Sequence, residues 1–507
     1  MSPLETVTTQ NSPGALAVAE AGVTTSHVPA LRQIKNLPGP RVWPLVGNAL
    51  QVKVSRIHLD MEQWCVRYGP LFRVYLGRQP LLVVANHATV SALLRDRPDR
   101  FRRPSVTAFI SSELGGLPNI FMAEGAEWRN QRRMVMAGFA PKAIKEYFPA
   151  LVNVGLRLRK RWSEAAATHA SIDLAADLKR YTVDIIAGLA FGQDVNTLES
   201  GENVIQQHLD RILPGISRRS LSAVPYWRYF KLPQDRRLEQ SSAALRQEVY
   251  SLIEQARQRM QRNPNAADRP ANLLEALIAA ADQPGSAIDN DTVAGNVSTM
   301  LLAGEDTTAN SIAWLLYFLR SHPEALQRAT REVQALAPDC AAFTLEQLDS
   351  LDFLGACIEE AMRLKPVAPY LPLEAVADTK VEDVHVPAGT IVWCVLRHDS
   401  MDEKNFVNAS TFDPARWLAT PDGAGPAATA SLGKNKGIDK SIAMPFGAGP
   451  RTCPGRYLAL LEIKIAVAML LGHFEIESVA TDAGLPPEEL MGFVMSPEGL
   501  KMRLKAR

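Results

Sequence analysis

The sequence predicts a mainly helical α+β fold, with small β-sheets, that forms one large unit around a long central helix. Three observations predict it. Apolar residues with helical spacing cover most of residues 88–363, strand-like runs are short, and no internal repeat or linker divides the chain. With 507 residues, of which 47% are hydrophobic, the chain is long enough to bury a large core.

The first 36 residues are predicted to form a flexible tail, and the folded domain is predicted to span residues 37–507. Glu5, Glu20 and several Ser and Thr residues interrupt every apolar run of the tail. No run approaches the ~20 apolar residues of a membrane span, and no basic segment precedes an apolar one as in a signal peptide. We therefore expect a cytoplasmic protein without a membrane span.

Several elements follow from local pattern. Residues 71–86 hold two Val- and Leu-rich runs around a Gly/Pro turn, which predicts a β-hairpin. The longest helical pattern covers residues 289–319, and a second helix is predicted for residues 345–364, before Pro366. Short strands are expected within residues 383–396 and in the closing segments HFEIES and GLKMRLK.

Charge and cysteine content exclude several classes of protein. The formal net charge is +1 and no long block of Lys and Arg is present, so nucleic-acid binding is not expected. The five cysteines are sparse, odd in number and form no Cys-x-x-Cys pair, which argues against a disulfide framework and fits a reducing compartment. They are Cys65, Cys340, Cys357, Cys394 and Cys453.

One of these cysteines lies in an unusual stretch, MPFGAGPRTCPGRYLALLEIKIAVAMLL (residues 444–471). A free cysteine is most often a small buried apolar residue. Here Pro454 is expected to open the following apolar helix. The Cys453 sulfur would then lie at a helix N-terminus, where the helix dipole favours a thiolate. Arg451 adds a positive charge nearby, suited to a carboxylate.

The same loop holds three glycines, Gly447, Gly449 and Gly455. Glycine removes a side chain, as is needed where the backbone closely approaches a flat and bulky group. A redox-active or nucleophilic cysteine would also favour a thiolate, but it would not require this clearance. The loop therefore favours a cysteine that binds a bulky planar group.

The segment FGAGPRTCPG (residues 446–455) resembles the haem-binding loop of the cytochrome P450 family, Phe-x-x-Gly-x-Arg-x-Cys-x-Gly, at every fixed position. The resemblance implies that Cys453 is the axial thiolate ligand of the iron in haem b and that the loop glycines contact this cofactor. It further implies that Phe446 shields the sulfur and that Arg451 pairs with a haem propionate. The implied fold is the single-domain fold of that family, with a long central helix over the haem.

Two charged residues three positions apart, Glu360 and Arg363, lie on one face of a predicted helix. Taken alone, such a pair is most simply a solvated salt bridge. Further along the chain, FDPARW supplies Arg416. The resemblance implies that Glu360, Arg363 and Arg416 form the buried Glu–Arg–Arg cluster of the family, whose role is structural.

The long predicted helix contains AGEDTT (residues 303–308). Gly304 weakens a helix by about 1 kcal/mol relative to Ala, and the simplest explanation is a tolerated glycine beside a polar face. The resemblance implies instead a local bulge that faces the iron, with Ala303 against the haem. Asp306 would then be the acid that feeds protons from solvent, and Thr307 the alcohol that delivers them to bound oxygen.

Two further positions concern the haem propionates. Trp128 and Arg132 in WRNQR lie one helical turn apart. Such a pair is usually a packed surface stack, but the resemblance implies contact with the propionates. The chain departs from the family near Glu374, where an arginine usually binds a propionate. Lys365 or His385 is expected to compensate, unless this propionate faces solvent.

The implied activity is that of a haem-thiolate monooxygenase that hydroxylates or epoxidises a hydrophobic organic substrate with O₂, with secondary metabolism as the expected setting. Two electrons would come from a separate ferredoxin or flavoprotein, because about fifty residues after the haem loop are too few for a reductase domain. This partner is expected to dock near Cys453 through Lys434, Lys436 and Arg456. A peroxide-driven enzyme and a non-catalytic haem sensor are the alternatives.

The substrate pocket is expected above the haem, lined mainly by apolar residues. Such a lining favours a terpenoid, fatty acyl or polyketide-like molecule. We expect a monomeric protein of bacterial origin. The pocket residues predicted from the sequence are Phe109, Met300, Val367, Phe493 and Val494.

Overall fold

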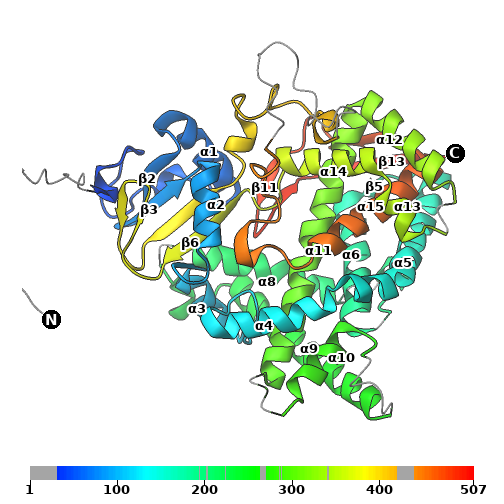
Figure 1. Ribbon diagram of the computed structural model, residues 1–507, viewed down its shortest axis with the longest axis horizontal. Coiled ribbons are helices and arrows are strands. Elements are labelled where there is room, and N and C mark those ends of the chain that lie inside the picture. Colours follow the sequence, from blue (N-terminus) through cyan, green and yellow to red (C-terminus); the bar gives the residue numbers. More distant parts are fainter. Residues whose placement is uncertain are drawn as a thin grey trace, which may run out of the picture.

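The computed structural model describes residues 31–192, 194–200, 204–222, 224–262, 270–284, 286, 288–339, 342–418 and 439–507. These residues form a mainly helical structure with four small sheets, which confirms the predicted fold class. Figure 1 shows the largest sheet with α1 (Ile57–Tyr68) and α2 (His87–Arg95) at one end of the molecule and most helices at the other.

The helical part is built on α11, which runs unbroken from Asn290 to Ser321 and packs against helices on several sides. The remaining helices are α3 (Ser105–Glu113), α4 (Gly125–Gly138), α5 (Pro141–Ala167), α6 (Leu174–Phe191), α7 (Thr197–Ser200), α8 (Val204–Ser220), α9 (Pro233–Arg262), α10 (Leu273–Ala281), α12 (Pro323–Leu336), α13 (Leu345–Asp349), α14 (Asp352–Leu364) and α15 (Arg456–His473).

The largest sheet has five strands in the order β2-β3-β9-β6-β4. They are β2 (Leu71–Leu76), β3 (Gln79–Val84), β9 (Ile391–Val395), β6 (Tyr370–Ala375) and β4 (Phe101–Arg102). The β3–β9 pair is parallel and the other pairs are antiparallel. The smaller sheets join β10 (Phe474–Ala480), β13 (Lys501–Ala506) and β5 (Ile172–Asp173); β1 (Arg32–Gln33), β8 (Val384–Val386) and β7 (Thr379–Val381); and β11 (Glu489–Met491) with β12 (Met495–Pro497).

Most elements predicted from local pattern are present. The hairpin of residues 71–86 is the β2–β3 pair, and the closing segments form the antiparallel β10–β13 pair. The long helix begins within one residue of the predicted start, where the Asp289 side chain accepts a hydrogen bond from the backbone N–H of Thr292. These elements carry their signal in consecutive residues.

One predicted helix is wrong in its bounds. The helix predicted for residues 345–364 is two helices, α13 and α14, and the Glu332 carboxylate accepts hydrogen bonds from the N–H groups of Phe353 and Leu354 in the first turn of α14. Residues 31–36, which the prediction placed in the tail, pack onto the folded part, because β1 pairs with β8 and Ile34 is buried. The other residues of the predicted tail, 1–30, lie outside the described residues.

Close packing of α6 against α11 explains Gly304. A Cβ atom at this position would lie 2.6 Å from the Ile186 side chain, so a larger residue would push the two helices apart. The Thr182 hydroxyl of α6 also donates to the Glu305 carbonyl of α11. Within the described part of the chain, no helix has both the length and the apolar character needed to span a membrane.

Candidate active site

The Cys453 loop is held by its own backbone between η7 (Gly449–Arg451) and α15. The Cys453 N–H donates to the Phe446 carbonyl at 3.0 Å, and the Thr452 hydroxyl donates to the Gly449 carbonyl at 2.7 Å. Helix α15 begins at Arg456, two residues after the predicted start at Pro454. The sulfur therefore lies just outside the first turn of the helix.

Cys453 is exposed, whereas the other described cysteines are buried. The pKa of its thiol is nevertheless raised, because the surrounding protein desolvates the sulfur. A hydrogen bond from the Gly455 N–H and the charges of Arg132 and Arg456 act in the opposite direction. The chain alone thus favours the thiol, and a coordinated metal ion would supply the thiolate by displacing the proton.

Of the three loop glycines, Gly449 differs in purpose from the prediction. Gly449 has φ +72°, and a Cβ atom there would lie 2.5 Å from the Leu94 carbonyl oxygen at the end of α2. Its clearance therefore serves helix packing. Gly447 also has φ +72°, which a turn requires. A Cβ atom at Gly455 would make only ordinary contacts, at 3.7 Å from the Phe139 ring.

Helix α4 joins the Cys453 loop through two arginines. Arg451 pairs with Glu124 at the start of the helix, and its guanidinium lies 4.8 Å from the Trp128 ring centroid. One turn further along α4, Arg132 donates to the Thr452 carbonyl at 2.8 Å. The sequence-predicted Trp128 and Arg132 are therefore both positioned at the loop that carries Cys453.

Four arginines, here called the Cys-loop arginines, interact electrostatically around this loop: Arg97, Arg103, Arg132 and Arg451. Glu124 is the carboxylate that opposes three of them. Burial and repulsion by neighbouring guanidiniums lower the pKa of Arg103 and bring that of Arg451 to about 10. The buried Nε atoms of Arg97 and Arg451 have no hydrogen-bond partner among the described residues.

This excess of positive charge fits a ligand with two carboxylates. Buried guanidiniums are stable when an anion pairs with them, and the described chain supplies fewer anions than cations here. The two propionates of a haem group would supply the missing charge beside Cys453. The sequence prediction missed Arg97 and Arg103, although the run RDRPDRFRRP (residues 95–104) carries five arginines next to a strand.

Among the described residues, Glu374 pairs with neither of the two predicted compensating residues, Lys365 and His385. It lies opposite Arg102 in the β4–β6 pair and accepts hydrogen bonds from Arg102 and from the N–H and hydroxyl of Ser105. Burial raises the pKa of Glu374, but these partners lower it more, so that it lies below its ordinary value. Glu374 therefore anchors the start of α3 and leaves the Cys-loop arginines free for an anion.

The predicted Glu360, Arg363 and Arg416 form one buried group, here called the Glu360 cluster. Arg363 donates to both Glu360 oxygens at 2.8 Å, and Arg416 donates to Oε1 at 2.9 Å. The Trp417 indole and the Asp413 backbone N–H complete the shell of donors. Every oxygen of Glu360 is paired within the protein.

The AGEDTT segment lies in regular α-helix, so the predicted bulge is not present. Ala303 is exposed, and the Thr307 hydroxyl donates to its carbonyl at 2.7 Å. Asp306 lies 2.8 Å from Lys179 of α6. The next residue, Thr308, hydrogen-bonds to Glu462 of α15, which links this segment to the helix that follows Cys453.

Four of the five predicted pocket residues lie in or near the interior. Met300 is buried in α11, and Val367, Phe493 and Val494 are partly buried. The Phe493 ring lies 5.8 Å from Phe121, whose own ring packs against Arg103.

Phe109 differs from the other four, because its side chain is 50% exposed and lies under the Arg228 guanidinium. The structure thus places it toward the outer segment that joins α8 to α9.

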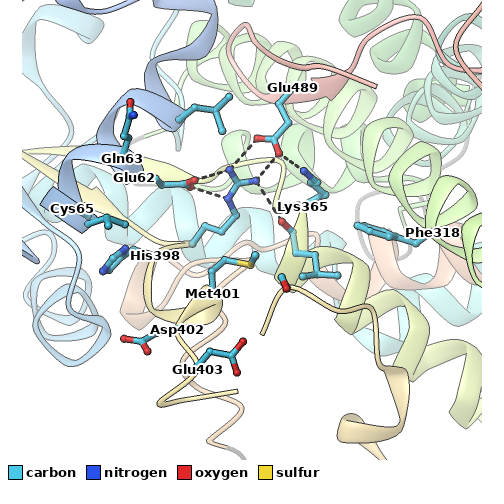
Figure 2. A pocket seen from close by; sticks show the side chains of 15 residues that line it. Glu62, Gln63, Cys65, Phe318, Lys365, His398, Met401, Asp402, Glu403 and Glu489 are labelled. Carbon is cyan, nitrogen blue, oxygen red and sulfur yellow. Dashed lines mark hydrogen bonds and ion pairs between the residues drawn. The ribbon is translucent and has the colours of Figure 1, made fainter. Parts of the chain in front are cut away.

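A cavity of about 790 Å³ lies between α1, the end of α14 and β11 (Figure 2). Arg397 joins Glu62 to Glu489 there, and Lys365 also pairs with Glu489. His385, the other residue predicted to compensate near Glu374, lies 3.6 Å from Asp378. The lining does not include the Cys453 loop, so this cavity is separate from the predicted haem site.

A family model described as cytochrome P450 matches residues 37–504. The chain therefore belongs to the cytochrome P450 family, a family of haem-thiolate monooxygenases that bind iron protoporphyrin IX through a cysteine. The match covers both the Cys453 loop and the Glu360 cluster, and it agrees with the mainly helical fold.

Curated relatives are distant but align along most of the chain. A self-sufficient cytochrome P450 monooxygenase of Oidiodendron maius is 27% identical over 479 residues, which cover 93% of this chain and 42% of that protein. The human mitochondrial 25-hydroxyvitamin D-1 alpha hydroxylase is 28% identical over 477 residues, which cover 90% of each chain. The rat thromboxane-A synthase is 25% identical over 494 residues, covering 90% of this chain and 89% of its own.

The chain spans less than half the length of the relatives that are named self-sufficient, such as another from Aspergillus niger, of which it covers 44%. These relatives come from fungi and animals, so they give no support to the predicted bacterial origin.

Proposed function

We propose that the protein is a monooxygenase that inserts one oxygen atom of O₂ into a hydrophobic organic substrate, using two electrons from a redox partner. The observation that carries this proposal is the exposed Cys453 thiol in a loop surrounded by the Cys-loop arginines, whose buried Nε atoms on Arg97 and Arg451 are unpaired. This donor set suits a thiolate-ligated cofactor that carries two carboxylates.

Haem bound here would supply the chemistry of O₂ reduction, in which an axial thiolate favours cleavage of the O–O bond. Cys453 would ligate the iron, and Arg97, Arg103, Arg132 and Arg451 would hold the propionates. Phe446 is partly buried and packs against the main apolar core, which supports a role in shielding the sulfur.

Asp306 and Thr307, the acid and the alcohol of α11, would transfer protons to the reaction. Asp306 is held by Lys179 at 2.8 Å, and this contact keeps the carboxylate toward the α6 side of the helix. The Thr307 hydroxyl is fixed by the Ala303 carbonyl, so its oxygen is oriented and can accept a hydrogen bond from a neighbouring group. Asp306 would pass a proton from solvent to Thr307, and Thr307 would deliver it to the reacting oxygen.

The substrate is proposed to be apolar, because Met300, Val367, Phe493 and Val494 offer few hydrogen-bonding groups. Titrating the haem spectrum with terpenoid, fatty acyl and polyketide-like compounds tests this, with charged metabolites as the comparison set. Spectral shifts with the charged set alone would contradict an apolar pocket.

The electron donor is proposed to be a ferredoxin or a flavoprotein that docks on the Cys453 side of the molecule. Arg456, whose side chain is 55% exposed, lies three residues after Cys453 and supports this surface. Lys434 and Lys436, which the sequence also predicted there, lie outside the described residues. Arg456→Glu should slow haem reduction by the natural donor while leaving chemical reduction by dithionite unchanged.

The carbon monoxide spectrum of the reduced protein tests the central assignment. Wild-type protein should show the red-shifted Soret band of a thiolate complex. Cys453→Ser should lose that band, whereas Cys65→Ala, which removes another free cysteine, should keep it. A haem-loaded wild-type protein without the shifted band would overturn the proposal.

Turnover then separates the monooxygenase from a peroxide-driven enzyme. With O₂ and a surrogate reductase, Thr307→Ala should consume electrons with little product, because the oriented hydroxyl is lost. Ser311→Ala is the matched control, since Ser311 makes the same bond to the Thr307 carbonyl one turn later. Product formation with peroxide alone, at the wild-type rate in both variants, would favour the peroxide-driven alternative.

A monomeric state, a cytoplasmic location and a place in secondary metabolism stay predictions from the sequence. Fractionation of the producing cells tests the location, and one animal relative is named as mitochondrial. Sedimentation of the purified holoprotein tests the oligomeric state.

A further inference from the structure

Four charged side chains from three helices meet on the side of α11 that faces α6 and α8. Lys179 of α6 lies 2.8 Å from Asp306 and 2.5 Å from Asp210 of α8. Carboxylate oxygens of Asp210, Glu305 and Asp306 lie within 4.8 Å of one another. Three acids therefore surround one lysine, and the lysine contacts only the two aspartates among the described residues.

Glu305 is the acid without a partner. Glu305 is only 2% exposed, and its Oε1 atom has no hydrogen-bond partner among the described residues. An ionised carboxylate in such a place is costly. Burial, together with the charges of Asp306 and Asp210, raises the pKa of Glu305 to about 9, although Lys179 acts in the opposite direction. At neutral pH Glu305 therefore carries a proton.

Lys179 keeps its charge in the same cluster. Burial lowers the pKa of Lys179, but the ion pairs with Asp306 and Asp210 raise it above its ordinary value. The two aspartates thus share one positive charge, and the proton of the cluster resides on Glu305. The groups that face Glu305 are Lys179 from α6, Asp210 from α8 and Asp306 from its own helix.

Exposure falls along the cluster from the surface inward. The Asp210 side chain is 42% exposed and the Asp306 side chain 15%, whereas Glu305 is buried. The carboxylate oxygens of the three acids lie within 4.8 Å of one another, and one water molecule can bridge this distance in a proton transfer. The cluster therefore leads from solvent at Asp210 to the acid beside Thr307.

We propose that Glu305 holds a proton in reserve and passes it to Asp306 during turnover, while Asp210 replenishes Glu305 from solvent. This rests on the proposed monooxygenase function. Glu305 acts through Asp306 and does not touch the reacting atoms, so it is a positioning residue for protons and not a catalytic residue. Its contribution should matter most when two protons are needed in quick succession.

The balance of the reaction requires such a supply. Each turnover combines one C–H bond, O₂, two electrons and two protons into one C–OH group and one water molecule. The Asp306 carboxylate beside Lys179 takes the proton of the Glu305 carboxyl group and passes it toward Thr307, so that Asp306 is a carboxylate again. The Glu305 carboxylate then takes a proton from water by way of Asp210, and the cluster returns to its starting charge.

Infrared spectroscopy of the holoenzyme tests the protonation of Glu305 without turnover. Glu305→Gln should remove a C=O stretching band of a protonated carboxyl group, and this band should titrate near pH 9 in the wild type, following the pKa of about 9. Glu462→Gln is the matched control, because Glu462 is another buried carboxyl with a pKa raised to about 8. An unchanged carboxyl region in Glu305→Gln would overturn the proposal.

Turnover tests the use of that proton. Glu305→Gln should lower product per electron pair about threefold to tenfold at pH 7.5 and increase the solvent deuterium isotope effect. The alkaline fall in coupling of the wild type should also disappear, and Glu305→Asp should restore part of the coupling. Wild-type coupling and an unchanged pH profile in Glu305→Gln would contradict the proposal.

The two proposals can fail separately. The carbon monoxide spectrum of Glu305→Gln should match that of the wild type, which checks the fold and the thiolate. A wild type without the shifted Soret band would overturn the monooxygenase, while the infrared band would still report on Glu305. A protonated Glu305 with unaffected coupling would overturn the proton reserve and leave the monooxygenase intact.

Discussion

Two groups of buried arginines differ in how their charge is balanced. In the Glu360 cluster, Arg363 and Arg416 bind both oxygens of one carboxylate, and Trp417 and Asp413 supply further donors. Among the Cys-loop arginines, the cations outnumber the described anions, and two Nε atoms have no partner there. In the first group both oxygens of Glu360 are paired, and the Arg416 Nη2 atom, which makes no hydrogen bond among the described residues, lies 3.8 Å from the Asp413 carboxylate. In the second group the surplus of cations supports the proposal that a further anion binds there.

This difference distinguishes arginines that stabilise the folded protein from arginines that are proposed to bind a ligand. A cluster whose donors and acceptors match inside the chain contributes to folding in the apoprotein. A cluster with surplus cations opposes folding until an anion binds, so its arginines should raise affinity for that anion at some cost in apoprotein stability. Variants of the two groups should therefore respond in opposite ways.

The largest effect is expected in the Glu360 cluster. Glu360→Ala leaves Arg363 and Arg416 buried without their carboxylate and should lower the free energy of unfolding by ~3–5 kcal/mol, in urea titrations with or without haem. Glu359→Gln, on the same helix, is the control and should change little, because Glu359 makes only a 3.7 Å contact with Arg456. Equal loss in both variants would contradict the role of the cluster.

A second prediction concerns Arg97. Arg97→Ala removes a donor to the proposed propionates, and haem should transfer to apomyoglobin at least about tenfold faster, as loss of a hydrogen bond to a charged group implies. The apoprotein should not lose stability, because an unpaired buried cation is removed. Arg100→Ala, at an exposed position in the same loop, should leave haem transfer unchanged. A wild-type apoprotein that unfolds more slowly than the Arg97→Ala apoprotein would contradict the proposed surplus of positive charge.

A third prediction uses a buried acid that has no cation. Burial raises the pKa of Glu462 to about 8, against the lowering effect of the Thr308 hydroxyl. Between its ordinary value and pH 8 the folded state binds more protons than the unfolded state, so stability is lost as pH rises across this window.

Calorimetry from pH 5 to pH 8 measures this loss. Glu462→Gln should show a flatter dependence of the melting temperature on pH than the wild type, and the gap between them should widen toward pH 8. Parallel melting-temperature profiles for the wild type and Glu462→Gln would contradict the raised pKa of Glu462.

The smallest effect is expected at Glu374. Glu374→Ala breaks the contacts with Arg102 and Ser105 and should cost ~1 kcal/mol, as for a partly exposed pair that also caps a helix. Haem transfer should stay at the wild-type rate, because the Cys-loop arginines lie elsewhere. Arg102→Ala should cost a similar amount and add little in the double variant. A strong change in haem transfer would place Glu374 in the propionate site.

The sequence predicted best the contacts between residues that are close together in the chain. Glu360 and Arg363 are three residues apart on one helix, and the β2–β3 hairpin is continuous. In each case the partners are neighbours in the chain, so local geometry decides whether they meet. The Cys453 loop was also evident, because its fixed residues fall within ten positions.

The sequence did not reveal partners that tertiary packing brings together. Arg97 meets Arg451, and Lys179 meets Asp210 and Asp306, only after distant helices pack. The break between α13 and α14 depends on Glu332, which reaches the new N-terminus from another helix. Glu374 was predicted only to stand where an arginine usually binds a propionate, and its partner Arg102 comes from the distant strand β4.

Gly449 has a consequence for anyone who redesigns this protein. Its Cα lies so close to the last turn of α2 that even a methyl group would collide with the Leu94 carbonyl. The end of the molecule that contains the large sheet therefore packs directly against the loop that bears Cys453. Grafting a foreign loop at this position would require reshaping the adjacent helix in the same step, because neither part can be exchanged as an independent module.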